Sequence, residues 1–233
     1  LVFFEADNWL STPCVVNDQW FVKIISPQNA LVQALFTGAR NLGAFSSGTE
    51  GFFERFESPV EMARHELEAT RRMREVGVNA PEPIEAFEVE GLGVLVLSYL
   101  EDFRSLEDLD ESEVRAVIPD LFDALTTLHE HDLAHGDLRG ENVLILDGEV
   151  FFIDATAVSE EGIDEARAYD IASALAALEP TVGARTAVDA AVDAYGIEAV
   201  LEAVDFLDFV NIRPDHDFDA AAVKGEVSTV ATE

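Results

Sequence analysis

Four side chains in the segment 128–154 have the types and spacing of a cation-binding and proton-handling site. His135, Asp137 and Asn142 follow one another in HGDLRGEN, and Asp154 comes after the next two apolar runs. Carboxylate and amide oxygens are the ligands that Mg²⁺ prefers. Asn142 and Asp154 are therefore a candidate metal pair with Asp137 close by, at a spacing that phosphoryl transfer can use.

A hairpin is expected to bring the two halves of this site together. The apolar runs 143–146 and 150–153 flank Asp147-Gly148, a pair that tolerates positive φ at both central turn positions. Antiparallel return of the second strand would place Asp154 beside Asn142. A surface turn can also carry Asp and Asn, but the full order of these residues and the hairpin argues against that alternative.

The string HGDLRGENVL followed by FFID resembles the protein-kinase-like superfamily of phosphotransferases. His-Gly-Asp in place of His-Arg-Asp is similar to its small atypical members: the RIO kinases, the kinase of the KEOPS complex, the lipopolysaccharide core kinases and, more distantly, the aminoglycoside phosphotransferases. The resemblance implies ATP and Mg²⁺ as cofactors. It also implies that Asp137 accepts the proton of an acceptor hydroxyl, that Asn142 and Asp154 hold Mg²⁺, and that His135 braces the loop.

Lys23 is the candidate for binding phosphate. Residues 13–25 read as two strands around Asn17-Asp18, with Lys23 inside the second. A strand lysine is ordinarily solvated, but this chain has only one other lysine. FVKII resembles the kinase strand whose lysine holds the α- and β-phosphates, which implies the same role for Lys23.

A helix over 58–76 is expected to supply the partner of that lysine. Ser58 is a favourable N-cap before a proline, and the arginines lie late in the segment. Glu66 resembles the helix glutamate that pairs with the strand lysine in kinases. Glu68 is the competing candidate, and both could instead be ordinary surface acids.

Residues 83–100 read as another hairpin, after which the chain turns polar. This boundary resembles the kinase hinge. The resemblance implies that Leu97 lies behind an adenine and that backbone groups of Ser98 and Leu100 bind its edge.

The second half of the chain is expected to be helical, with helices near 113–130, 165–178, 187–195 and 198–209. Asp170 resembles the helix aspartate that braces the catalytic loop, although a solvated helix acid is the alternative. The expected fold is α+β and two-lobed, like a protein kinase. An antiparallel-sheet lobe with one main helix spans 1–100 and contains a long insert, 26–58. A small, mostly helical lobe spans 101–212 with the catalytic loop at 135–142, and 213–233 is expected to be a flexible tail.

The composition restricts the environment and the partners. The chain has 233 residues, is 48% hydrophobic, and carries 47 acidic against 14 basic residues, a net charge of −33. Such a charge disfavours direct binding to nucleic acid. A single cysteine, Cys14, excludes an intrachain disulfide. With no apolar run long enough to cross a bilayer, the sequence predicts a cytoplasmic protein without membrane contact.

Acid-rich, lysine-poor composition resembles that of proteins from extreme halophiles, where molar salt screens self-repulsion. We therefore expect the fold to weaken in dilute buffer. The melting temperature, followed by circular dichroism from low to molar KCl, should rise with salt. A melting temperature that does not rise would contradict the halophilic interpretation.

The sequence favours an ATP-dependent phosphotransferase, either a RIO-like serine/threonine protein kinase or an ATPase. Its acceptor would be a protein or a small-molecule hydroxyl. One alternative is a small-molecule kinase like the aminoglycoside phosphotransferases, and another is a catalytically dead nucleotide-binding scaffold. Two departures from the kinase sequence pattern keep the scaffold alternative open. No glycine-rich loop precedes Lys23, and Ala155-Thr156 follows Asp154 where kinases have Phe-Gly.

Overall fold

Five antiparallel strands and one long helix form the N-terminal lobe. The computed structural model describes residues 2–3, 11–29, 56, 58–155, 162–211 and 218–232. The sheet has the order β1-β2-β3-β5-β4. Its strands are β1 (Val2–Phe3), β2 (Thr12–Val16), β3 (Trp20–Ile25), β4 (Pro83–Val89) and β5 (Leu92–Ser98).

The turn chemistry read from the sequence is confirmed. Asn17 and Asp18 have φ of 54° and 53°, and Asp147 and Gly148 have φ of 53° and 84°. Positive φ at both central residues defines the tight turn that suits the twist of a two-stranded hairpin. The first pair joins β2 to β3. The second joins β7 (Val143–Leu146) to β8 (Glu149–Phe152), which pair in antiparallel register.

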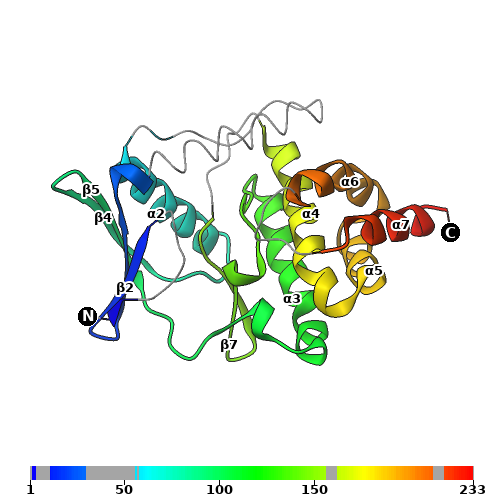
Figure 1. Cartoon of the computed structure of the whole chain (residues 1–233), viewed down its shortest axis with the longest axis horizontal. Helices are drawn as coiled ribbons and strands as arrows, with labels where there is room; N and C mark the ends of the chain where they lie inside the picture. Colours follow the sequence, from blue (N-terminus) through cyan, green and yellow to red (C-terminus); the bar gives the residue numbers. More distant parts are fainter. Residues whose placement is uncertain are drawn as a thin grey trace.

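Helix α2 (Pro59–Glu75) packs on the sheet face that is turned toward the rest of the molecule (Figure 1). Ser58 caps it, since its side chain accepts a hydrogen bond from the Glu61 amide. Met62 and Ala63 are buried against Ile25, Leu95 and Leu97 of the sheet. The same helix face carries Glu66 one turn after Met62, so burial of this apolar stripe fixes where the carboxylate points.

Gly93 on β5 allows α2 to approach the sheet. A Cβ at this position would lie 2.1 Å from the Pro59 carbonyl oxygen and 2.9 Å from the Val60 nitrogen. We expect Gly93→Ala to lower the free energy of unfolding by about 1–3 kcal/mol, because backbone atoms must move to admit the methyl group. Denaturant unfolding in molar KCl measures this effect.

Gly225 provides the matched control for that substitution. It lies inside α7 (Ala220–Val230), where an added Cβ meets nothing within 4 Å. Gly225→Ala should stabilise the protein by about 0.5–1 kcal/mol, because alanine favours a helix over glycine. A Gly93→Ala variant as stable as wild type would show that the close approach of α2 to β5 at Gly93 does not contribute to stability.

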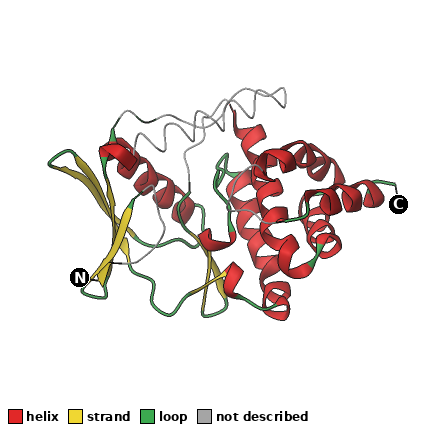
Figure 2. Cartoon of the chain, in the orientation of Figure 1, coloured by secondary structure: helices red, strands yellow, loops and turns green. Residues whose placement is uncertain are grey.

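The C-terminal lobe combines a small sheet with packed helices (Figure 2). The sheet has the order β6-β7-β8, and β6 (Arg104–Ser105) is a strand that the sequence did not predict. Helix α3 (Glu111–Glu130) begins at a capping box formed by Asp110 and Glu113. It ends shortly before His135, as the sequence predicted.

Three further helices complete the main body of this lobe. They are α4 (Ile163–Val182), α5 (Ala184–Tyr195) and α6 (Ile197–Asn211). Helix α4 is buried along most of its length, with Ala172, Leu175 and Leu178 fully inside the core. It lies centrally among α3, α5 and α6 (Figure 1). The predicted α+β class, an antiparallel sheet with one main helix followed by a mostly helical lobe, is confirmed.

One expectation for the C-terminus is wrong, because residues 220–230 form helix α7 rather than a flexible tail. Phe218, Val223 and Val227 are buried in the core of the lobe. These residues form one apolar face that packs against α5 and α6. The polar residues between them in the sequence made this face hard to recognise. The insert 26–58 falls mostly outside the described residues, so its role stays a prediction.

Within the described ranges, no helix is both long and apolar enough to cross a bilayer.

Candidate active site

Short local structures position the residues of the loop 135–142. A 3₁₀ turn, η2 (Gly140–Asn142), leads directly into β7. The Ile153 amide at the end of β8 donates a 3.1 Å hydrogen bond to the Asn142 carbonyl. The two ends of the hairpin are therefore tied together, and Asp154 follows one residue after that contact.

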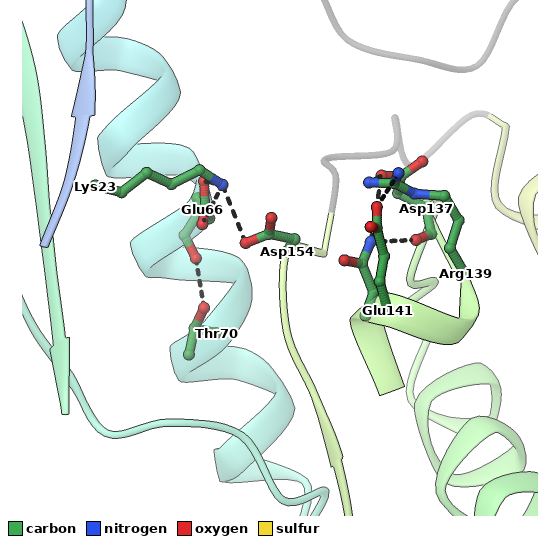
Figure 3. A network of polar contacts seen from close by, with 8 residues as sticks. Lys23, Glu66, Thr70, Asp137, Arg139, Glu141 and Asp154 are labelled. Atoms are coloured by element: carbon green, nitrogen blue, oxygen red, sulfur yellow. Dashed lines mark hydrogen bonds and ion pairs between the residues drawn. The ribbon is translucent and has the colours of Figure 1, made fainter. Parts of the chain in front are cut away.

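Lys23 lies between two carboxylates that come from distant parts of the chain (Figure 3). Its Nζ is 3.0 Å from both Glu66 oxygens and 3.0 Å from Asp154 Oδ1. Glu68, the competing candidate, instead pairs with Arg71 on the exposed side of α2. The structure thus brings together Lys23, Glu66 and Asp154, called here the lysine cluster.

Burial and charge act in opposite directions on the lysine cluster. Burial lowers the pKa of Lys23, but the charges of Asp154 and Glu66 outweigh it, so the pKa is raised overall. Burial raises the pKa of Asp154, yet the Lys23 ammonium holds that pKa below its usual range. For Glu66, burial dominates over the attraction of Lys23, and the charge of Asp154 adds to it, raising the pKa to about 7.

The raised pKa of Glu66 gives a pH-dependent stability. The folded protein binds a proton on Glu66 more tightly than the unfolded chain, whose carboxyl has a pKa near 4.5. This contribution is fully present below pH 4.5 and is lost as the pH rises through about 7. Glutamine does not titrate, so the Glu66→Gln variant does not lose this contribution. When the pH goes from 5 to 8, its free energy of unfolding should therefore rise relative to that of wild type by on the order of 2 kcal/mol.

Denaturant unfolding of metal-free and nucleotide-free protein at both pH values checks this prediction. Burial lowers the pKa of His135, so this residue makes the folded protein more stable as the pH rises, opposite to Glu66. The contribution of His135 is the same in wild type and in the variant, and it cancels when their free energies of unfolding are compared. Glu68→Gln is the control, because that side chain is 56% exposed on the same helix. An equal response of the two variants to pH would contradict the assignment of the effect to Glu66.

Asp170 on α4 braces the backbone of the candidate catalytic loop. It is fully buried, and its two oxygens accept hydrogen bonds from the amides of His135, at 2.6 Å, and Gly136, at 2.8 Å. His135 is also fully buried, its Nδ1 accepts from the Asp137 amide at 3.3 Å, and its ring meets Phe152 edge to face. Both side chains thus contact the backbone of the loop 135–142, and their support of catalysis stays a prediction.

Asn142 and Asp154 have suitable chemistry for a divalent cation. The Asn142 amide nitrogen donates to the Asp137 carbonyl at 2.8 Å, so its amide oxygen is the atom that can serve as a ligand. Among the described residues no group of three or more acidic, histidine or cysteine side chains could hold a metal by itself. Mg²⁺ is typically held by one or two carboxylates together with substrate phosphates and water, and its binding here stays a prediction.

Asp154 also adopts a strained backbone. Its φ is 58°, in the left-handed region that non-glycine residues rarely enter. Strain of this kind persists where the surrounding structure holds it, often at functional sites. Here the Lys23 contact is one of the interactions that hold it.

Arg139 is a residue of this site that the sequence reasoning missed. Its guanidinium donates to Asp137 Oδ2 at 3.2 Å and forms an ion pair with Glu141. Figure 3 shows Arg139 with Asp137 and Glu141 on one side of Asp154, and Lys23 with Glu66 on the other. A basic residue two positions after Asp137, in a chain with so few basic residues, was the available signal.

The three hinge residues lie where β5 leaves the N-terminal lobe. Leu97 is buried opposite Phe21 of β3, and Leu100 lies in the segment that leads to β6. The Ser98 amide donates to the Glu82 carbonyl at 2.9 Å, and its hydroxyl accepts from the Glu82 amide. The Ser98 amide and hydroxyl are therefore engaged within the protein, and the roles of all three residues stay predictions.

Comparison with known proteins relates this geometry to a family. The KEOPS complex subunit Bud32 of Pyrococcus abyssi is 32% identical over 125 residues, 52% of this chain and 56% of that protein. Serine/threonine-protein kinase 36 of Mus musculus is 31% identical over 100 residues, 38% of this chain and 8% of the kinase. The chain thus spans about half the length of Bud32 and a small part of the longer kinase.

A solved structure, that of the Cydia pomonella granulovirus kinase PK-1, aligns with a TM-score of 0.43 and 19% identity. The alignment covers 68% of this chain and 51% of the viral kinase. The family model described as the RIO domain matches residues 53–169. That range includes Glu66, Asp137, Asn142 and Asp154, while Lys23 lies outside it and joins the site through the fold. Since the match covers half of the chain, this protein belongs to the RIO domain family.

Proposed function

We propose that this protein is an ATP-dependent phosphotransferase that transfers the γ-phosphoryl group to a hydroxyl with Mg²⁺. Membership of the RIO domain family supports a kinase or ATPase. The observation that carries the proposal is the lysine cluster, in which Lys23 Nζ is 3.0 Å from both Glu66 and Asp154, facing Asp137 across the site. The acceptor that we favour is a serine or threonine hydroxyl of a protein, including this chain itself.

Each residue has a role that follows from its chemistry. Lys23, oriented by Glu66, binds the α- and β-phosphates through charge-assisted hydrogen bonds. Asp137 accepts a hydrogen bond from the acceptor hydroxyl, aligns it and takes its proton. Arg139, already beside Asp137, is positioned to neutralise charge on the transferred group.

Asn142 and Asp154 would hold Mg²⁺, which neutralises phosphate charge during transfer. Asp154 Oδ1 also contacts Lys23 Nζ at 3.0 Å, so the lysine and the cation would share this carboxylate. The net charge of −33 makes added salt favourable for the entry of an anionic nucleotide.

A second candidate function is a nucleotide-binding scaffold without transfer. The observation that favours it is the sequence FEADNWL at 4–10, which contains no glycine between the first two strands. Kinases usually cover the phosphates there with a glycine-rich loop. On this alternative the lysine cluster would still bind nucleotide.

Transfer of radiolabelled γ-phosphate from ATP in molar KCl with Mg²⁺ tests the proposal. Label on the protein or released as phosphate, lost in Asp137→Ala and Lys23→Ala variants, would support a protein kinase or ATPase. Label that appears only on an added hydroxylated metabolite would support a small-molecule kinase. Nucleotide binding by folded protein without any transfer would overturn the proposal in favour of the scaffold.

A further inference from the structure

A line of hydrogen bonds runs from helix α5 to the candidate catalytic loop. Tyr195, the last residue of α5, has its hydroxyl 2.8 Å from His129 Nδ1 on α3. The other ring nitrogen of His129, Nε2, is 3.3 Å from Asp170 Oδ2 on α4. Asp170 in turn accepts the amides of His135 and Gly136, immediately before Asp137.

The direction of these hydrogen bonds follows from donor and acceptor chemistry. A carboxylate only accepts, so His129 Nε2 must carry the proton that faces Asp170. In the tautomer protonated on Nε2 alone, Nδ1 is the acceptor, and the Tyr195 hydroxyl donates to it. Burial, with the charge of Asp170, raises the pKa of Tyr195, which keeps its hydroxyl protonated as this arrangement requires.

The packing around the line keeps its members in place. His129 is 5% exposed and Asp170 is fully buried. The Tyr195 ring lies edge to face against Phe122, with centroids 6.2 Å apart, and its centroid is 5.5 Å from that of His129. The ring can therefore stay packed when only its hydroxyl is removed.

We propose that Tyr195 is a positioning residue for phosphate transfer, because its hydroxyl bonds His129 Nδ1 and so orients the ring whose Nε2 donates to Asp170, the residue that holds the loop before Asp137. Without that hydroxyl, the ring of His129 can tilt away from Asp170. Asp170 Oδ2 then loses one donor, and the segment at His135 and Gly136 is held less rigidly. Displacement of a catalytic group by a fraction of an ångström is costly for rate. This inference rests on the proposed function for its kinetic part only.

Tyr195→Phe is the test variant, and two of its readouts do not depend on activity. Nitrogen-15 NMR of histidine-labelled protein reports whether the His129 Nε2–H is hydrogen-bonded. Hydrogen exchange reports protection of the His135 and Gly136 amides. We expect the variant to shift the Nε2 resonance toward that of a weaker hydrogen bond, to exchange both amides about tenfold faster, and to lower kcat about tenfold with KM for ATP unchanged.

Tyr169→Phe is the matched control, since it removes another buried tyrosine hydroxyl in the same lobe, from a ring packed on Phe206 and Phe209. It should leave the His129 Nε2 resonance and both amides as in wild type. In a His129→Gln background, Tyr195→Phe should have no further effect on kcat or exchange, because the intermediate group is gone.

An unchanged His129 Nε2 resonance in Tyr195→Phe, or amide exchange equal to that of Tyr169→Phe, would overturn the inference. If wild-type protein transfers no phosphate, the proposed function fails, and the NMR and exchange results alone decide the role of Tyr195. The two failures are therefore distinguishable.

Discussion

Asp137→Asn is expected to lower phosphate transfer by roughly 10²–10⁴-fold while nucleotide binding stays near that of wild type. Asparagine has the size of aspartate but cannot take a proton from the acceptor hydroxyl. Asp137 lies on the opposite side of the site from the lysine cluster and contacts Arg139 and Asn142 instead. The loss should therefore fall on kcat rather than on nucleotide affinity.

Rates of label transfer in molar KCl with Mg²⁺, together with ADP affinity by calorimetry, measure the two quantities separately. Asp147→Asn is the control: it makes the same chemical change in the turn between β7 and β8. Asn-Gly forms that turn as readily as Asp-Gly, so transfer should be unaffected. Turnover of Asp137→Asn within threefold of wild type would exclude Asp137 as the proton acceptor.

Lys23→Met should destabilise the fold and weaken nucleotide binding together. The methionine keeps the apolar stem but leaves Glu66 and Asp154 facing each other without a cation. Breaking a buried ion pair by removing one partner costs about 3–5 kcal/mol, and salt screens buried pairs poorly. ADP affinity should fall about 10–100-fold, because charge-assisted hydrogen bonds to phosphate are lost.

The loss of stability should also depend on pH in a defined direction. Lys23 lowers the pKa of Asp154 and opposes the rise in the pKa of Glu66. Without it both carboxyl groups hold protons at higher pH, so the variant should be least stable near pH 8 and recover on acidification toward pH 5. Denaturant unfolding across this range measures the effect.

Lys224→Met is the control, since it removes the other lysine of the chain. Lys224 pairs with Asp208 at 2.6 Å, but that carboxylate is 77% exposed. A surface pair contributes about 0–1 kcal/mol, so the variant should unfold like wild type and bind ADP normally. Equal losses of stability and of ADP affinity in the two lysine variants would exclude a specific role of Lys23 in binding phosphate.

The sequence by itself determined the local parts of the site. Asn17-Asp18 and Asp147-Gly148 encode two hairpins, because few residue pairs tolerate positive φ at both turn positions. The alternation of side chains along a strand placed Lys23 on the face away from its apolar neighbours. Ser58 and the spacing of apolar residues likewise fixed α2, with Glu66 on its inner side. These features depend on a few neighbouring residues, which is why they could be predicted.

Only the tertiary structure decided which side chains meet. Lys23 contacts Glu66 across 43 residues of sequence and Asp154 across 131, and Tyr195 reaches His129 across 66. Burial at these contacts, not residue type, gives Glu66 a pKa of about 7 and makes Asp170 a brace rather than a solvated acid. Helix α7 is stabilised because Val223 and Val227 pack on an apolar surface of α5 and α6, which precede it in the sequence. Local propensity cannot report such contacts, since their free energy comes from surfaces that exist only after the lobes have packed.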